Sequence, residues 1–200
     1  MVVGSDVQWM IFMATIAKKM KDRFTALLIT GGLLAGCAPM VVDPNNRDQV
    51  MNGVTVSSDP GQKAFVHYEG PTLTSHSDQE EGAETIEFSL HAAVYAGRPT
   101  RFFLNVNDYY QGHWHGYNKA SDSEGHVFQA TISSQAPNCE FNCEFMDTLE
   151  IELSQDDLLK HKDIGITLRL NGPVQVESAP FHIPAPYLQG FLQKVTSASR

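Results

Sequence analysis

From about residue 52 onward, apolar and polar residues alternate along the chain in short runs. Successive side chains on a strand point to opposite faces, so this period of two predicts half-buried β-strands. The clearest run is residues 84–95 (ETIEFSLHAAVY), whose inward positions are Ile86, Phe88, Leu90, Ala92 and Val94. Similar runs are residues 100–108, 126–133, 147–154 and 163–170, with weaker ones at 53–57, 63–69 and 173–178. The pattern therefore predicts about eight strands.

Turn-forming residues separate these runs, as in Asp59-Pro60-Gly61 and Asn171-Gly172-Pro173. Short strands at this spacing predict an all-β fold, a mainly antiparallel β-sandwich of about eight strands. Segment 72–84 (TLTSHSDQEEGAE) is polar and acidic without an apolar period, and we expect it to be a surface loop.

Helix signals are few. Ser154 is followed by acidic residues and predicts the cap of a short helix that ends near Lys160. Pro186 begins a stretch with one apolar face, which predicts a short C-terminal helix packed on the sandwich.

The N-terminal region has the order of a secretory signal: basic residues at 18–23, an apolar run at 24–34, then small residues. The apolar run is too short for a membrane-spanning helix. Leu34-Ala35-Gly36-Cys37 resembles the lipobox of bacterial lipoproteins, which implies cleavage before Cys37 and acylation of that residue. Residues 1–12 fit no signal, and the sequence leaves open whether translation starts at Met13 or Met20.

These features predict three parts: a signal peptide at 1–36, a lipidated tether at 37–51 and a single β-sandwich domain at 52–197. In lipoproteins an aspartate after the cysteine favours the inner membrane, and Ala38 stands there instead. We therefore expect a protein of the bacterial cell envelope, anchored by its N-terminal lipid in the outer membrane and facing the periplasm.

The charge of the processed chain excludes one class of partner. Of the 14 basic and 23 acidic residues, residues 1–36 hold four and two, which leaves 10 against 21, a formal net charge of -11. Such a surface repels phosphate backbones, so nucleic acid is not expected as a partner.

Cys139 and Cys143 lie close together in NCEFNCEF. In an oxidising periplasm we expect a structural disulfide between them, although a redox pair or a metal clasp stays open as an alternative. The redox reading lacks a Cys-x-x-Cys spacing, and zinc needs two further ligands.

Residues 107–118 (NDYYQGHWHGYN) are rich in aromatic and histidine residues. On a continuous strand, His113 and His115 point to one side and Trp114 to the other, where it belongs to the core. The alternatives are a patch for a glycan or a protein, and a metal site that uses both histidines and a third ligand such as His91, Asp108 or His126. The candidate binding patch consists of Tyr109, Tyr110, His113, Trp114, His115 and Tyr117.

The remaining acidic motifs have ordinary explanations. Residues 122–125 (DSEG) resemble part of a calcium loop, but they also suit a hairpin turn. Glu150 and Glu152 lie on the polar face of a strand, where we expect solvated side chains and not a catalytic pair. No phosphate-binding loop, nucleophile elbow or dinucleotide motif is present, so the sequence predicts no cofactor. A triad assembled in space stays open.

Four further motifs occur along the processed chain: VSSD at 56–59, DYYQGHW at 108–114, the cysteine pair and PYLQGFL at 186–192. With these motifs the chain resembles a family of uncharacterised bacterial envelope lipoproteins. The resemblance implies no activity, substrate or catalytic residue.

Three functions are compatible with the sequence. The favoured one is a non-catalytic envelope lipoprotein that presents a surface to another envelope protein or a glycan. The alternatives are a periplasmic hydrolase without a visible motif and a metal-binding protein that uses His113 and His115.

Replacing Cys37 by Ser tests the anchor. The variant should stay as an uncleaved, unacylated precursor, because lipobox processing requires the cysteine thiol. Mass spectrometry of the envelope fraction measures this, and a variant that is processed and acylated like the wild type would disprove the lipobox.

Overall fold

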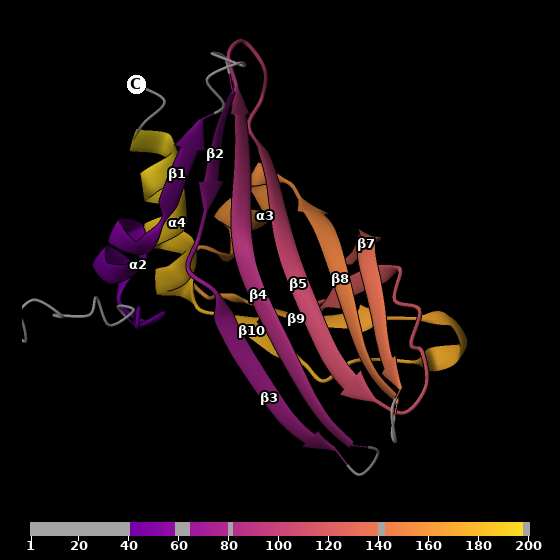
Figure 1. Cartoon of the computed structure of the whole chain (residues 1–200). Helices are drawn as coiled ribbons and strands as arrows, with labels where there is room; N and C mark the ends of the chain where they lie inside the picture. The colour runs from indigo at the N-terminus through magenta and orange to yellow at the C-terminus, as the bar shows by residue number, and fades with distance from the viewer. Residues whose placement is uncertain (1–40, 59–64, 80–81, 140–142, 198–200) are drawn as a thin grey trace, which may run out of the picture. The chain divides into compact units, whose positions relative to one another are not determined.

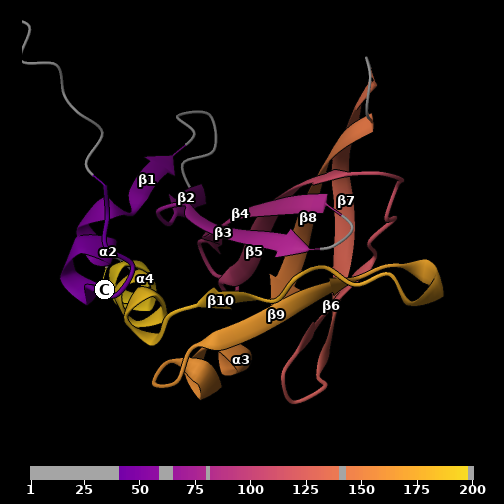
Figure 2. The ribbon, with the colours of Figure 1, turned by 90° about the horizontal axis from the view of Figure 1, so that it is seen from below.

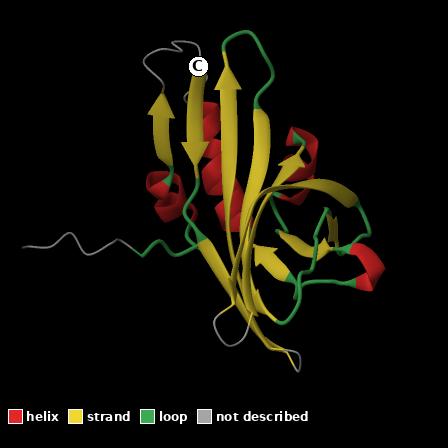
Figure 3. Ribbon diagram, turned by 45° about the vertical axis from the view of Figure 1, so that its right-hand side comes forward, coloured by secondary structure: helices red, strands yellow, loops and turns green. Residues whose placement is uncertain are grey.

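The structure, a computed structural model, describes residues 41–58, 65–79, 82–139 and 143–197. Strand makes up most of the described chain (Figure 3). The described elements, in chain order, are α2 (Arg47–Gly53), β1 (Thr55–Ser58), β2 (Phe65–Glu69), β3 (Leu73–Gln79), β4 (Gly82–Tyr95), β5 (Arg101–Gln111), β6 (Lys119–Asp122), β7 (Val127–Cys139), β8 (Cys143–Leu153), α3 (Gln155–His161), β9 (Ile166–Asn171), the 3-10 helix η2 (Pro173–Gln175), β10 (Phe181–Ile183) and α4 (Ala185–Ser197).

All strand pairs described are antiparallel, in the order β1-β2-β4-β5-β8-β7-β6-β9-β10, with β3 beside the first half of β4. The sheet folds over along β7, whose start pairs with β6 and whose remainder pairs with β8. Strands β9 and β10 therefore cross one face of β4, β5 and β8 as a second layer (Figures 1 and 2). This open, sandwich-like arrangement confirms the predicted fold class, with ten strands described instead of about eight.

The core lies between the two layers. Inward residues of the four clearest strands are buried: Ile86, Phe88, Leu90 and Ala92 on β4, Phe102, Leu104 and Val106 on β5, Leu149, Ile151 and Leu153 on β8, and Ile166, Leu168 and Leu170 on β9. Phe88 meets Phe181 of β10 across the interface, with ring centroids 4.9 Å apart. The alternation thus predicted which faces are buried. The predicted inward positions Val94, Ala130 and Ile132 are only partly buried, and Ile164, also predicted inward, precedes β9 and is 67% exposed.

Both predicted helices form. Ser154 caps α3 through a reciprocal capping box with Asp157. The apolar face of α4 is buried, and its Tyr187 hydroxyl accepts the Leu90 N–H at 3.3 Å and donates to the Pro71 carbonyl at 2.6 Å. These bonds attach α4 to β4 and to the connection between β2 and β3.

The boundary between tether and domain needs correction. Helix α2 begins within segment 37–51, capped by Asn46, and Val50 is fully buried. Gly190 of α4 permits the close contact, since a Cβ there would lie 2.5 Å from the Arg47 carbonyl oxygen. The compact unit therefore begins at Val42, because a packed helix replaces the expected flexible stretch.

Other local predictions were also wrong. Segment 72–84 is not a loop: β3 and the start of β4 run through it, since pairing with β4 satisfies the backbone of a polar strand. Residues 173–178 form η2 and one isolated bridge instead of a strand. The short strands β6 and β10 carried no clear alternation and were not predicted.

Several predicted features fall outside the described residues. These are the signal peptide, Cys37 and the first part of the tether. The described backbone pairs Cys139 with Cys143 at the end of the β7–β8 hairpin, and the disulfide itself stays a prediction. Among the helices of the described ranges, none is long and apolar enough to cross a membrane.

Val50→Ala tests whether α2 belongs to the folded unit. Losing two buried methyl groups should cost about 2 kcal/mol and lower the Tm by roughly 4 to 8 °C. Val41→Ala is the matched control, because Val41 is 90% exposed and its loss should leave the Tm unchanged. Equal melting temperatures of both variants, measured by circular dichroism, would show that α2 does not contribute to stability.

Candidate functional site

Three carboxylates lie inside the fold at one end of the central strands. Asp108 continues the inward series of β5 by one step beyond its apolar residues, and it is fully buried. Glu84 stands two residues before the buried Ile86 on β4. Asp147 stands two residues before the buried Leu149 on β8 and lies directly opposite Asp108 in the strand register. The period of two that buries the core thus also turns these acids inward.

Asp108 is the most unusual of the three. Both of its carboxylate oxygens are buried, and no hydrogen bond of normal geometry reaches them from the described residues, although Tyr117 and Glu84 lie close enough to affect its pKa. Burial, together with the nearby charges of Glu84 and Asp147, raises the pKa of Asp108 from 3.8 to about 8. Buried polar atoms are nearly always paired, so this carboxylate requires an explanation.

The two neighbouring acids are held by hydrogen bonds. Glu84 accepts the Ala179 N–H at 2.7 Å and the Tyr117 hydroxyl at 3.4 Å. Asp147 accepts the Tyr110 hydroxyl at 2.8 Å. Burial raises the pKa of both carboxyls, while these hydrogen bonds lower it. The two acids are therefore fixed in position around Asp108.

His115 reaches this cluster from the loop between β5 and β6. Its ring stacks on Tyr110 with centroids 3.8 Å apart, and its Nδ1 lies 2.7 Å from the Tyr117 hydroxyl. Gly112 and Gly116 have φ angles of 108° and 62°, which other residues rarely adopt, and they fold the loop back over the end of β5. The loop thereby brings an imidazole to the carboxylates.

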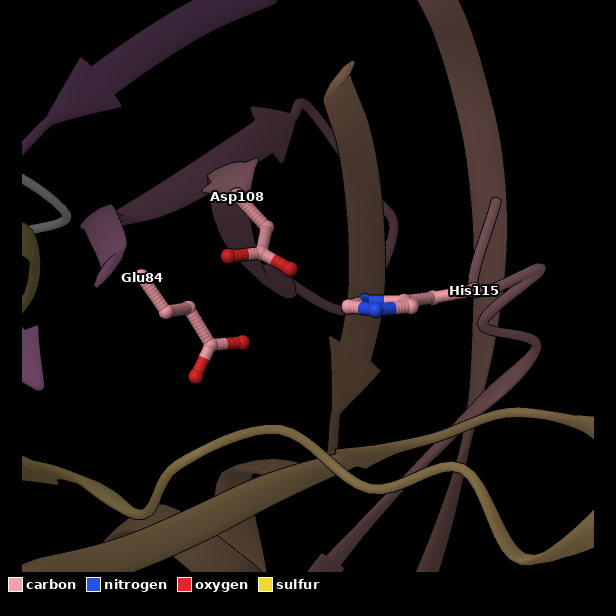
Figure 4. A group of neighbouring side chains, drawn as sticks. All are labelled: Glu84, Asp108 and His115. Carbon is pink, nitrogen blue, oxygen red and sulfur yellow. The ribbon is translucent and has the colours of Figure 1, made fainter. Parts of the chain in front are cut away.

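Glu84, Asp108 and His115 each offer one ligand atom, and these atoms all lie within 4.8 Å of one another. Figure 4 shows the two carboxylates and the imidazole ring pointing toward a common space, from β4, β5 and the following loop. Two carboxylate oxygens and an imidazole nitrogen form a ligand set that suits divalent metals such as zinc.

A hollow of about 510 Å³ gives access to the cluster. Glu84 and His115 line it together with His113 and Glu177, while Asp108 is not part of its lining. The cluster therefore has one buried carboxylate behind two side chains that a solute can reach.

The structure divides the predicted binding patch. Strand β5 ends at Gln111, so the expected continuous strand through 107–118 was wrong. Tyr110, His115 and Tyr117 lie at the cluster, Tyr109 is exposed, and His113 and Trp114 lie on the exposed part of the loop. Trp114 is 55% exposed, which contradicts its assignment to the core.

Sequence reasoning counted Asp108 among the possible metal ligands and missed Glu84 and Asp147. The available signal was their spacing, since each stands two residues beyond an inward apolar residue. Which acids share a neighbourhood depends on the strand register, which the sequence pattern did not specify.

The other acidic candidates behave as expected. Asp122 lies in a turn, where its Oδ1 accepts the backbone N–H groups of Glu124 and His126 at 2.9 and 2.8 Å and its Oδ2 has no hydrogen-bond partner among the described residues. Glu150 and Glu152 are exposed, and Glu152 accepts a hydrogen bond from Arg101 at 3.1 Å.

Asp108→Asn should stabilise the metal-free protein. A carboxyl whose pKa rises from 3.8 to about 8 on folding makes the free energy of unfolding fall as the pH rises through that range. Asn cannot ionise, so the variant should match the wild type near pH 4 and exceed it by at least about 2 kcal/mol at pH 8, a Tm increase of roughly 4 to 8 °C. Thermal unfolding in EDTA measures this.

Asp156→Asn serves as the control, since Asp156 is exposed in the first turn of α3. It should change the Tm by less than about 2 °C at either pH. If Asp108→Asn loses stability with pH as steeply as the wild type, Asp108 is not the group that titrates.

Comparison with known proteins gives no match: no family model, no curated protein and no solved structure is significantly similar to the chain. The function is therefore argued from the site itself.

Proposed function

We propose that the folded unit is a divalent-cation-binding module in which Glu84, Asp108 and His115 are the ligands. The observation that carries this proposal is the fully buried Asp108 carboxylate, which lacks a hydrogen bond of normal geometry among the described residues and offers a ligand atom close to those of Glu84 and His115. A cation bound there would supply the missing partner.

The energetics support a functional reason for the cluster. Gathering three carboxyls in a buried space costs stability, because desolvation and mutual repulsion both disfavour their ionised forms. Without a cation, Asp108 avoids the cost by holding a proton. With a cation, the carboxylates can ionise and bind it. The free energy of cation binding would then offset the stability lost by burying the carboxyls.

The ligand set favours zinc. Imidazole is a poor ligand for calcium and magnesium, and the cluster has no thiolate or thioether that would select copper(I). Two tyrosines contact the ligands from outside: Tyr110 stacks on His115, and the Tyr117 hydroxyl bonds Glu84 and lies 2.7 Å from His115 Nδ1. Such outer contacts orient metal ligands and tune their basicity.

This assignment differs from the metal site expected from the sequence, which paired His113 with His115. The rings of these histidines lie 5.9 Å apart in an edge-on arrangement, and His113 does not belong to the group whose ligand atoms lie within 4.8 Å of one another. His113 lines the adjacent hollow and is a candidate outer ligand.

A periplasmic hydrolase is the second candidate, because Glu84 has a raised pKa and lines a hollow. One deep cleft would favour it strongly, yet the described residues line several hollows of similar volume, from about 380 to 510 Å³. Surface binding of a protein or glycan loses support, because the aromatic residues no longer form one patch.

The module would act in the bacterial envelope. The lipobox at residues 34–37 supports anchoring in the outer membrane through acylated Cys37, with the folded unit facing the periplasm. A disulfide between Cys139 and Cys143 would suit that compartment.

Isothermal titration of the purified mature chain with Zn²⁺ tests the proposal. The wild type should bind with micromolar or tighter affinity, and Asp108→Asn should weaken this binding at least about 100-fold while stabilising the metal-free protein. Glu84→Gln should weaken it as well, because it also removes a ligand charge. Asp156→Asn should bind as the wild type does.

Two outcomes would contradict the proposal. Unchanged zinc binding in Asp108→Asn would place the ion elsewhere. A wild type that binds neither Zn²⁺ nor Mn²⁺ would leave the carboxyls as a proton-sharing cluster and favour the hydrolase.

A further inference from the structure

A second group of ligating side chains lies where the turn between β6 and β7 meets the end of α3. It consists of Asp122, Glu124 and His161, and it shares no residue with the first cluster. One ligand atom from each residue lies within 4.8 Å of the others. The turn and the helix are separated by about thirty residues of sequence, so only the fold brings them together.

Asp122 is the feature that requires a ligand. It is 8% exposed, and its Oδ1 accepts the two backbone N–H groups of the turn, which fixes the carboxylate in place. Its Oδ2 is buried and has no hydrogen-bond partner in the described part of the chain. A buried carboxylate oxygen of Asp122 therefore lacks a partner in a group whose ligand atoms lie within 4.8 Å of one another.

His161 is oriented as metal-binding histidines usually are. It is 4% exposed, and its Nδ1 lies 2.8 Å from the carbonyl oxygen of Asp157, one helical turn earlier. A carbonyl only accepts, so Nδ1 carries the hydrogen and Nε2 is the nitrogen that can bind a cation. A backbone carbonyl behind the ring is a common outer partner of a metal-bound imidazole.

Glu124 completes the group at its exposed edge. Its Oε2 forms an ion pair with Lys160, which leaves Oε1 for a cation. His126 and Asp157 also lie nearby and face each other at 3.7 Å. The negative charges in this neighbourhood outnumber the lysine that neutralises them.

We propose that Asp122, Glu124 and His161 form a second divalent-cation site, which links the β6–β7 turn to α3. Its ligand set matches that of the first site, with two carboxylates and one imidazole, so zinc is again the expected ion. One ion here joins two elements that are distant in sequence, and it acts as a clip that stabilises their contact.

The test counts zinc ions bound to the mature chain by equilibrium dialysis and metal analysis. The wild type should bind two, Asp122→Asn one, Asp108→Asn one, and the double variant none. Asn at position 122 keeps a carbonyl oxygen for the two backbone N–H groups, so the turn should survive. Glu124→Gln, at an exposed position, should weaken the second site about 10-fold without affecting the fold.

Hydrogen exchange locates the ion independently of the first site. In Asp108→Asn, zinc should slow exchange in residues 122–126 and in α3, and Asp122→Asn should abolish that protection. Asp156→Asn, on the same helix but outside the group, should bind two ions. Loss of zinc in Asp122→Asn with no change in Asp108→Asn would support this site and refute the first.

A wild type whose zinc is lost entirely in Asp108→Asn would overturn the second site. Equal losses in Asp122→Asn and Asp156→Asn would overturn it as well, because they would reflect the general charge of the region.

Discussion

The inward face shared by β4, β5 and β8 is the feature on which the rest of the structure depends. Along most of these strands the inward side chains are apolar and buried. Burying one large apolar side chain contributes roughly 1.5 to 3 kcal/mol to the free energy of folding. The second layer of β9 and β10 packs on this face, and α4 is attached to β4 through Tyr187. If the register of these strands shifted by one residue, every apolar side chain would move to solvent.

The same constraint explains the candidate site. Once the register is set by the apolar residues, Glu84, Asp108 and Asp147 must also face inward, because they lie an even number of residues away. The chain thereby carries a cost that a purely structural sandwich would avoid by placing apolar residues there. Acids retained at such positions are more readily understood as ligands than as structural elements.

The two proposed cation sites use the fold differently. The first is built on the rigid ends of two neighbouring strands, and a loop supplies its imidazole, so its accessible side opens to a hollow. The second joins a turn to a helix and has little to do with the central face. Each site contains a buried carboxylate without a full set of hydrogen bonds among the described residues. In the first site both oxygens of Asp108 are affected, and in the second only Oδ2 of Asp122.

Local patterns in the sequence determined the strands that alternate strongly, the two capped or amphipathic helices and the buried side of each. They did so because alternation and capping depend on neighbouring residues only. Tertiary structure decided the rest: polar β3 exists because β4 satisfies its backbone, and α2 is ordered because Val50 packs beside Gly190. His115 meets Glu84 and Asp108 only after the strands have paired and two glycines have turned the loop back. These contacts join residues far apart in sequence, and they depend on strand register and loop closure, which no local pattern encodes.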